Sequence, residues 1–406
     1  MRGLQAALTA CAVLALAGGA AAEDAPTGVA PASTTTVRIA YLGQHIAQKL
    51  PSSFMETPPQ DDGVAGARVG VEDDNTTGRF TAQNFVLDEQ LIQGEGDVAA
   101  AFRKLVEAGH RLVVADLSAT ALLAIAELPE AKSVLLLNVA AKDDALRGET
   151  CRANILHLMP SRAMLADALV QYLVLKRWRN VLLVPGPTDA DKAYAEAVER
   201  SVKKFGAKLV GTKPWTFEPG ARRTDTGHYA IAAEVARFTQ GLSYDVLVVA
   251  DEGGTFGNEL PFRTTDPRPV VGTQGMMATA WARPFEQWGA TQLQNRFRRE
   301  VGRWMSERDY AAWMAVRAIG EAATRARSGD ADAILGFIRS DKFDLAAFKG
   351  VKLSFRPWDG QLRQPILLAD ADSLVSVSPQ PGFLHQFSEL DTLGIDRPET
   401  RCALAK

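Results

Sequence analysis

From Thr36 onward, short apolar runs alternate with amphipathic stretches, and this alternation constrains the fold more than any other feature. The first run, residues 37–42, reads as a strand with Gly43 at its exit, and residues 112–115 read as a buried strand. Between them, Asp97 is placed to cap a helix whose apolar residues share one face. Strands that alternate with helices are typical of a mostly parallel sheet covered by helices.

A second series of the same kind follows, with strands expected at 181–184 and 246–250 and a helix at 189–205. A chain of this length also exceeds what one hydrophobic core usually serves. We therefore predict an α/β fold of two lobes, each a mostly parallel sheet flanked by helices, joined by multiple hinge crossovers. The predicted division is 36–153 plus 269–340 for lobe 1, 154–268 plus 341–390 for lobe 2, and a C-terminal tail at 391–406.

The first residues predict export. Arg2 precedes an apolar run at 4–17, and small residues lead to Ala22 before the first acids. This order is typical of a signal peptide cleaved after Ala22, here residues 1–22, which places the mature protein in the periplasm. Residues 23–35 would form a flexible leader. Cys11 sits in a short lipoprotein-like box, so a lipid anchor at Cys11 is the alternative.

Cleavage would remove Cys11 and leave Cys151 and Cys402 as the cysteines of the mature chain. Two cysteines in an oxidising compartment favour one disulfide, Cys151–Cys402, which would tie the tail back to the middle of the protein. Two free buried thiols are the alternative.

Charge and motifs exclude several classes of function. The net charge is −3 and no basic stripe is present, so no nucleic-acid partner is expected. The five histidines lack metal-ligand spacing, and the chain has neither a Gly-x-Ser-x-Gly motif nor a Walker loop. We predict a binding protein that is not an enzyme, is a monomer and requires no cofactor.

Ligands of open α/β sheets bind beyond the carboxyl ends of the strands, so the residues at the strand exits are the candidate binding residues. Asp251 and Glu252, after the best strand of the second series, are the leading pair. A third acid and several hydroxyl, amide and aromatic side chains complete the predicted set. The predicted ligand-binding residues are Asp116, Ser118, Thr120, Asn138, Asp251, Glu252, Gln274 and Trp281.

Acidic residues recur at strand exits in both predicted lobes, with few cations close in sequence. Hard polyvalent cations prefer several carboxylate oxygens, and such an ion would relieve repulsion between facing acids and draw the lobes together. The predicted metal ligands are Asp116, Asp189, Asp191, Asp251 and Glu252. The alternative is that most of these acids cap helices or lie solvated in loops.

The sequence resembles the type I periplasmic binding proteins, the family of branched-chain amino acid receptors. The resemblance rests on the strand at 37–42, the segment at 70–75, the Ser118 turn, the segment at 154–161 and the helix at 310–316. It implies two lobes with a ligand cleft between them. It also implies that Ser118 and Thr120 bind a ligand carboxylate, and that Asp251 or Glu252 binds an ammonium group.

Segments at 151–157, 251–257 and 394–399 resemble a narrower group of receptors encoded beside PQQ-dependent quinoprotein alcohol dehydrogenases. That resemblance implies the substrate-binding component of an ABC importer, with an inner-membrane permease as partner and a lanthanide ion as cargo. One alternative is a receptor for a small organic solute, such as an amino acid or an alcohol-derived product. Another is a periplasmic partner that hands metal or cofactor to a quinoprotein dehydrogenase.

Overall fold

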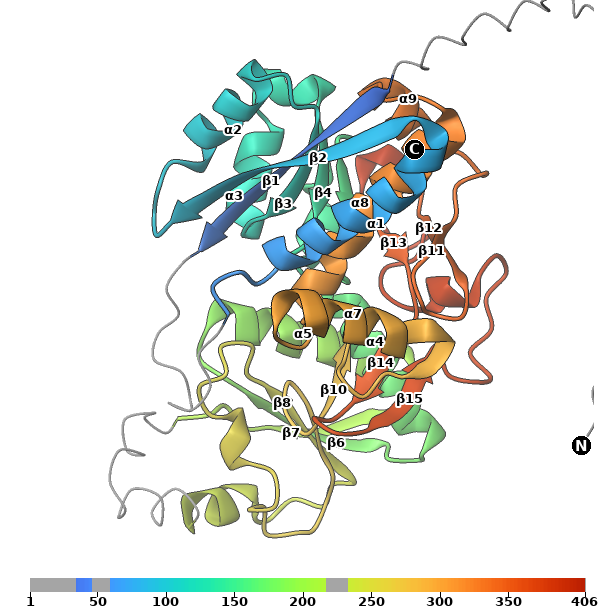
Figure 1. Ribbon diagram of the computed structural model, residues 1–406. Helices are drawn as coiled ribbons and strands as arrows, with labels where there is room; N and C mark the ends of the chain where they lie inside the picture. Colours follow the sequence, from blue (N-terminus) through green and yellow to red (C-terminus); the bar gives the residue numbers. More distant parts are fainter. Residues whose placement is uncertain (1–33, 46–58, 217–232, 406) are drawn as a thin grey trace, which may run out of the picture. The chain divides into compact units, whose positions relative to one another are not determined.

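Five parallel strands form the first sheet, in the order β2-β1-β3-β4-β5 (Figure 1). The computed structural model describes residues 34–45, 59–216 and 233–405. The strands are β1 (Thr35–His45), β2 (Gln83–Gln93), β3 (Leu112–Asp116), β4 (Leu135–Asn138) and β5 (Ile155–His157).

The alternation of side chains along these strands produces two cores. Ile39 and Tyr41 on β1 pack with α1 (Val64–Thr81) and α8 (Glu307–Ala326), whereas Ala40 and Leu42 pack on the opposite face. That second face is covered by α2 (Val98–Glu107) and α3 (Ala119–Ala126). Successive side chains of a strand point to opposite faces, so a sheet covered on both faces needs apolar residues at consecutive positions, as at 39–42 in β1 and 112–115 in β3.

Seven strands form the second sheet, in the order β15-β14-β10-β9-β8-β6-β7. Its neighbours pair in parallel from β10 to β7, whereas β14 is antiparallel to both β10 and β15. Helices α4 and α5 share a core with one face. The elements are α4 (Arg162–Leu175), β6 (Asn180–Pro185), α5 (Asp189–Lys204), β7 (Lys208–Thr212), β8 (Val246–Ala250), β9 (Val270–Gly272), β10 (Met276–Thr279), β14 (Ile366–Ala369) and β15 (Leu374–Ser378).

The remaining elements complete the core of the first sheet. Apolar residues of α7, α9 and a small three-stranded sheet all belong to the cluster that contains α1 and α8. These elements are α7 (Ala290–Val301), α9 (Ala331–Ile338), β11 (Leu345–Ala346), β12 (Lys352–Phe355) and β13 (Leu362–Arg363). We call the first sheet with its helices and this small sheet lobe 1, and the seven-stranded sheet with its helices lobe 2.

The chain passes between the lobes after β5, after β10 and after β13, in each case later than the sequence predicted. The first predicted crossing, at about residue 153, is too early because Ile155 on β5 still pairs with Leu136 on β4. The second, at about 268, is too early because β9 and β10 extend the sheet of lobe 2. The third, at about 340, is too early because β11, β12 and β13 pack into the core of lobe 1.

Buried side chains bind these crossings to one another. The Gln364 amide donates to the Leu158 carbonyl (2.7 Å), which joins the third crossing to the first. The Lys349 ammonium donates to the Ala280 carbonyl and to the Pro365 carbonyl (3.2 Å), which joins the second to the third. Burial lowers the pKa of Lys349 to about 7, with a smaller opposing effect of Glu307.

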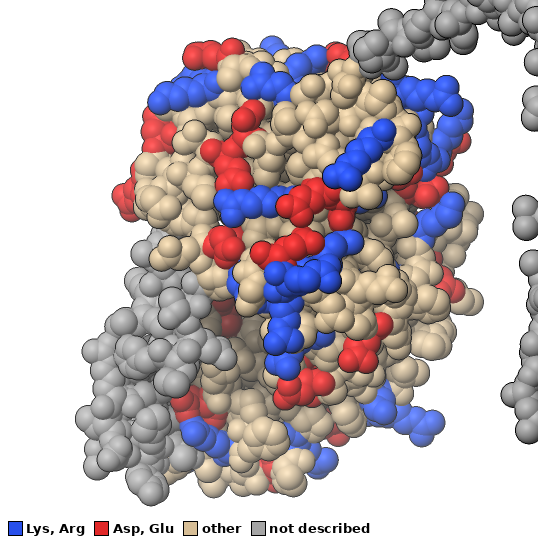
Figure 2. Space-filling model, viewed as in Figure 1, with Lys and Arg blue, Asp and Glu red and all other residues tan. Residues whose placement is uncertain are grey.

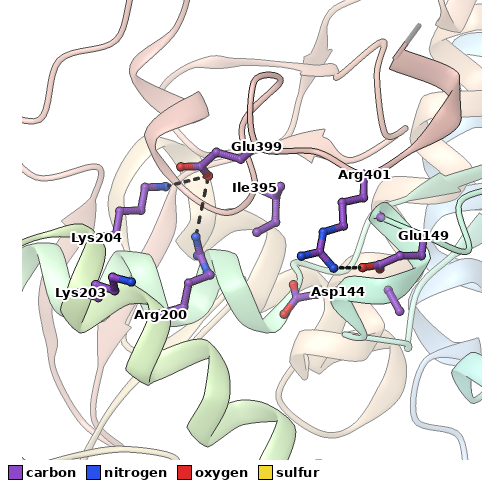
Figure 3. Close-up of a pocket in the computed structure, with 10 residues that line it drawn as sticks. Asp144, Glu149, Arg200, Lys203, Lys204, Ile395, Glu399 and Arg401 are labelled. Atoms are coloured by element: carbon purple, nitrogen blue, oxygen red, sulfur yellow. Dashed lines mark hydrogen bonds and ion pairs between the residues drawn. The ribbon is translucent and has the colours of Figure 1, made fainter.

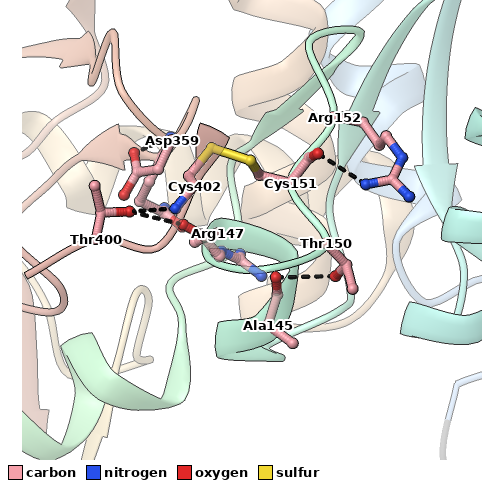
Figure 4. The surroundings of a disulfide bond; sticks show 9 residues. Ala145, Arg147, Thr150, Cys151, Arg152, Asp359, Thr400 and Cys402 are labelled. Carbon is pink, nitrogen blue, oxygen red and sulfur yellow. Dashed lines mark hydrogen bonds between the residues drawn. A yellow bond between two sulfur atoms is a disulfide. The ribbon is translucent and has the colours of Figure 1, made fainter. Parts of the chain in front are cut away.

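The tail returns from lobe 2 to lobe 1 and is fixed there by a disulfide between Cys151 and Cys402 (Figure 4). On the lobe 2 side, the Gly394 N–H donates to the buried Asp167 carboxylate (2.8 Å). Near the disulfide, the Thr400 hydroxyl donates to the Arg147 carbonyl (3.4 Å). The disulfide therefore adds a fourth covalent connection between lobes already joined by three crossings.

Some sequence predictions fall outside the described residues. The signal peptide (1–22) and nearly all of the leader (23–35) lie there. Within the described residues, no helix is both long and apolar enough to cross a membrane.

Candidate functional site

Both sheets contain the same five-strand arrangement, which fixes where each has its switch point. In lobe 1 the order β2-β1-β3-β4-β5 places β1 beside β3, and in lobe 2 the order β7-β6-β8-β9-β10 places β6 beside β8. In each case the chain leaves these two central strands toward opposite sides, and ligands of such sheets bind beyond the carboxyl ends at this point. Asp116 ends β3, and Asp251 directly follows β8.

One side chain joins the carboxyl edges of the two sheets. Arg162, the first residue of α4, forms an ion pair with Glu252 in the loop after β8 (2.7 Å). It also forms an ion pair with Asp143 in the loop after β4 of lobe 1 (3.2 Å). The loops beyond the two sheets therefore meet at Arg162, and the site lies between the lobes.

A buried acidic group lies at the switch point of lobe 1. The Tyr41 hydroxyl donates to Asp116 (2.7 Å), and an Arg308 guanidinium nitrogen lies 3.5 Å from the same carboxylate. Burial raises the pKa of Asp116, although Arg308 and the Tyr41 hydroxyl oppose the shift. Arg308 is partly exposed and also lies 3.8 Å from Asp62, so it brings a positive charge to this edge. Figure 2 shows basic and acidic side chains side by side over the face that carries α1 and α7.

Ser118 provides an exposed hydroxyl beside this group. Its oxygen accepts the Ala121 N–H (3.2 Å) and so caps α3, which leaves the hydroxyl hydrogen free to donate to a ligand. Thr120, in the first turn of α3, is exposed as well. The structure thus places Ser118 and Thr120 next to Asp116 in sequence and at the same edge of the sheet.

Asp251, predicted as a leading ligand residue, is bound by its own loop. Its two carboxylate oxygens accept the N–H groups of Thr255, Phe256 and Gly257 and the hydroxyl of Thr255, at 2.6–3.1 Å. Asp191 is used in the same way: it forms a capping box with Thr188 and accepts the Glu252 N–H (2.7 Å). These two acids shape the loop after β8.

Glu252 is the acid of this loop that reaches the junction between the lobes. Its side chain is 19% exposed and accepts three N–H···O contacts from Arg162 at 2.7–3.1 Å. Burial disfavours the charged form of Arg162, but the bonds to Glu252 and the charge of Asp143 outweigh it and raise the pKa of Arg162. Arg162 is therefore charged near neutral pH.

A second ion pair connects this junction to lobe 1. The Lys142 ammonium, next to Asp143, donates to Glu307 at the start of α8 (2.7 Å). Burial alone would raise the pKa of Glu307, but Lys142 and the hydrogen bonds from Ala280 and Thr279 lower it. Glu307 is next to Arg308 in the sequence, so these contacts form one series of charges of alternating sign that crosses from lobe 1 to lobe 2. The series is Asp116, Arg308, Glu307, Lys142, Asp143, Arg162 and Glu252.

The other predicted ligand residues lie in structural positions. Asn138 is fully buried and bonds to the backbone of Ala140 and Ala141 and to the His157 ring. Trp281 is buried and stacked on Tyr310, with ring centroids 4.2 Å apart. Gln274 is half-buried and packs against Gly257, next to the loop of Asp251.

The five predicted metal ligands are not gathered into one group. Asp189 is fully exposed beside Lys192, whereas Asp116, Asp191, Asp251 and Glu252 have the separate partners described above. Over the ranges that the structure describes, no cluster of three or more His, Cys, Asp or Glu side chains has a geometry that could hold a metal ion.

The sequence prediction missed the cations of the site. Arg162 and Arg308 stand at the starts of α4 and α8, far along the chain from Glu252 and Asp116, which they contact. Tyr41 was placed in a strand but not at the site. The position of Arg162 could have been inferred from the sequence. Ser161 is a helix-capping residue just after a predicted crossing, so the next residue begins a helix near the junction of the lobes.

Two sheets of matching strand order, joined by repeated crossings and with their switch points turned to a shared junction, define a two-lobed α/β solute-receptor fold. A family model described as "Periplasmic binding protein" matches residues 59–374, and the chain belongs to this family. No curated protein sequence matches it.

Solved structures agree on the fold. A branched chain amino acid ABC transporter periplasmic ligand-binding protein of Burkholderia xenovorans LB400 is 16% identical and has a TM-score of 0.69, over 92% of this chain and 100% of that one. A periplasmic binding protein of Burkholderia mallei is 17% identical with a TM-score of 0.63, over 92% and 100%. The branched-chain amino acid substrate-binding protein LivJ of Streptococcus pneumoniae, in complex with isoleucine, is 15% identical with a TM-score of 0.59, over 85% and 99%.

Proposed function

We propose that this protein is the substrate-binding component of an ABC importer, works in the periplasm with an inner-membrane permease, and binds an amino acid. The observation that carries the proposal is the pair of switch points, which offers an exposed hydroxyl at Ser118 and a carboxylate at Glu252 on opposite lobes. Two of the structural relatives are named for branched-chain amino acids, and one holds isoleucine, which supports this ligand class.

The two ends of an amino acid fit the two sides of the junction. The ligand carboxylate would accept the Ser118 hydroxyl, beside the first N–H groups of α3 and the positive charge of Arg308. The ammonium would donate to Glu252, whose oxygens have lone pairs beyond those that Arg162 uses. Because each lobe binds one end of the ligand, binding would favour the state in which the lobes are together.

Isothermal titration calorimetry with leucine, isoleucine, valine and alanine tests the proposal directly. Ser118→Ala should weaken binding about 10- to 100-fold, because a hydrogen bond to a charged group is lost. Ser118→Asp keeps a capping oxygen for α3 but adds a negative charge, so it should abolish binding without a loss of helix stability. Full affinity in Ser118→Asp would show that the carboxylate binds elsewhere.

A pair of neighbouring variants separates a ligand contact from a structural role. Glu252→Gln should lower amino-acid affinity at least about tenfold with little change in melting temperature. Asp251→Asn should lower the melting temperature, because one oxygen that accepts loop N–H groups becomes a donor. The reverse pattern would contradict the assignment of Glu252.

The narrower sequence resemblance implies a different cargo, a lanthanide ion, and binding measurements can distinguish it from an amino acid. None of the relatives reported above is named for a metal or a quinoprotein, and the described residues contain no group of three or more carboxylates that could hold a metal ion, so the amino acid is better supported. Terbium luminescence sensitised by tryptophan, at micromolar metal, together with no heat from any amino acid, would favour the ion instead.

A further inference from the structure

A cavity of about 700 Å³ lies away from the switch points and beneath the C-terminal tail (Figure 3). Three segments line it: the turn of η2 (Asp144–Arg147) in lobe 1, the last turns of α5 in lobe 2, and the tail. Ser118, Arg162 and Glu252 are not among its lining residues.

Four cations border this cavity: Arg200, Lys203 and Lys204 of α5 and Arg401 of the tail. The Lys204 ammonium is satisfied, because it donates to Asp167 (2.9 Å) and to the carbonyls of Thr392 (3.2 Å) and Gly394 (3.0 Å). The other three cations therefore decide what the cavity can bind.

Arg200 has donors to spare. One terminal nitrogen, Nη2, donates to Asp167 (2.7 Å), but Nε is buried with no hydrogen-bond partner among the described residues. The other terminal nitrogen, Nη1, lies 4.0 Å from the Glu399 carboxylate, which is beyond hydrogen-bond distance. Nη1 therefore makes no hydrogen bond to a described residue, and an anionic acceptor beside it would add a charge-assisted hydrogen bond.

Glu399 of the tail marks where such an acceptor would lie. Its carboxylate is about half exposed and stands 4.0 Å from both Arg200 and Lys204, attracted to them but bonded to neither. On the far side of the cavity, Arg401 is 78% exposed and forms an ion pair with Glu149 (2.9 Å). Figure 3 shows the Arg200 and Arg401 guanidinium groups on either side of Ile395.

We propose that this cavity is a second binding site, for a small oxyanion that carries at least two carboxylate or phosphate groups. Arg200, Lys203 and Arg401 would hold it, with one anionic group in the place now approached by Glu399. A bound oxyanion would join α5 of lobe 2 to the tail that Cys402 ties to lobe 1, and so would favour the state with the lobes together. The proposal does not depend on the identity of the ligand at the switch points.

Calorimetry at low ionic strength with citrate and with pyrophosphate tests this site, with sodium chloride at matched ionic strength as the salt control. Lys203→Gln with Arg401→Gln should weaken binding at least about tenfold, because two charge-assisted contacts are lost. Lys208→Gln is the matched control: it removes one exposed cation of the same lobe outside the cavity and should change the affinity less than about twofold.

Glu399→Gln gives a prediction in the opposite direction. Removal of the competing carboxylate should raise affinity for the oxyanion several-fold. Binding of pyrophosphate alone would assign the site to phosphates, and binding of citrate alone would assign it to polycarboxylates. No binding of either at millimolar concentration, an equal loss in Lys208→Gln, or weaker binding in Glu399→Gln would overturn the proposal.

Discussion

Lys349 is buried and donates to carbonyl oxygens of two different crossings, and no carboxylate of the described residues is hydrogen-bonded to it. It lies over the rings of Phe285 and Tyr310, 5.6 and 5.3 Å from their centroids. These contacts keep the second and third crossings together, but they stabilise a charged ammonium less than water does. Folding therefore disfavours the charged form of Lys349.

The stability of the protein should depend on pH through this residue. The pKa of Lys349 is about 7 in the folded protein and near its ordinary value of 10.5 in the unfolded chain, so the unfolded chain binds more protons between these values. The free energy of unfolding should rise with pH across this window, by up to about 1.4 kcal/mol per pH unit, relative to Lys349→Met. Urea unfolding of both proteins from pH 6.5 to 10 measures this, and parallel profiles would contradict it.

At the residue scale, the sequence predicted where acids would gather but not what each acid would do. Asp116, Asp251 and Glu252 all lie at strand exits, as the strand pattern indicated. Whether backbone N–H groups donate to a carboxylate depends on the path of the loop that follows it. For this reason the adjacent residues Asp251 and Glu252 have different roles: Asp251 accepts N–H groups of its own loop, and Glu252 accepts N–H groups of Arg162. The arginines of the site come from helices remote in sequence, and their proximity is a product of the tertiary fold.

At the scale of elements, α1 and α8 approach closely because α1 carries glycines on the face toward α8. A Cβ atom on Gly66 would lie 1.9 Å from the Asp309 carbonyl oxygen, and one on Gly70 would lie 2.9 Å from Val316. The same contact places Asp309 where its side chain accepts the Gly63 N–H (2.8 Å) at the start of α1. This packing fixes the beginning of α8, where Glu307 and Arg308 enter the site.

Gly66→Ala should lower the free energy of unfolding by about 1–3 kcal/mol or more, because the clash is with backbone that cannot move aside. Gly336 on α9 is the matched control, since a Cβ there would meet nothing within 4 Å. Gly336→Ala should be neutral or stabilise the protein by up to about 1 kcal/mol through helix propensity. Equal effects of the two substitutions in chemical denaturation would argue against close α1–α8 packing.

The elements that the sequence predicted best are the buried strands and the long amphipathic helices. The expected strands at 37–42, 112–115 and 246–250 lie within β1, β3 and β8, because continuous apolar runs suit strands covered on both faces. The short strands β9 and β15 were missed. β9 has only three residues, and β15 lies at the edge of its sheet with most of its residues half-buried or exposed, so both give a weak hydrophobic signal.

At the scale of the whole molecule, the two-lobed α/β architecture could be predicted, whereas the positions of the crossings could not. The chain crosses to the other lobe only after the last strand that pairs with the sheet of its own lobe. Strand pairing joins residues far apart in the sequence, so local composition does not predict it. The tail is an example: Asp391 pairs with Arg356 and Arg363 of lobe 1 (2.9 and 2.8 Å), although Leu393 packs in the core of lobe 2.

The disulfide should matter for the molecule as a whole. Replacement of both Cys151 and Cys402 by Ser should lower stability by about 2–5 kcal/mol, because the bond closes a long loop in the unfolded chain. Spin labels on α2 and α5 should then report a broader distribution of distances between the lobes. Reductant should have this effect on the native protein and none on the double variant; identical unfolding midpoints with and without the bond would contradict the role.

The position of this bond also bears on how faithfully it forms. Cys151 and Cys402 are 251 residues apart, so during synthesis Cys151 has to remain a free thiol until nearly all of the chain has been made. The one other cysteine in the sequence is Cys11, inside the predicted signal peptide. Cleavage after Ala22 would therefore remove the single competitor for Cys151, and only the correct intramolecular partner would remain.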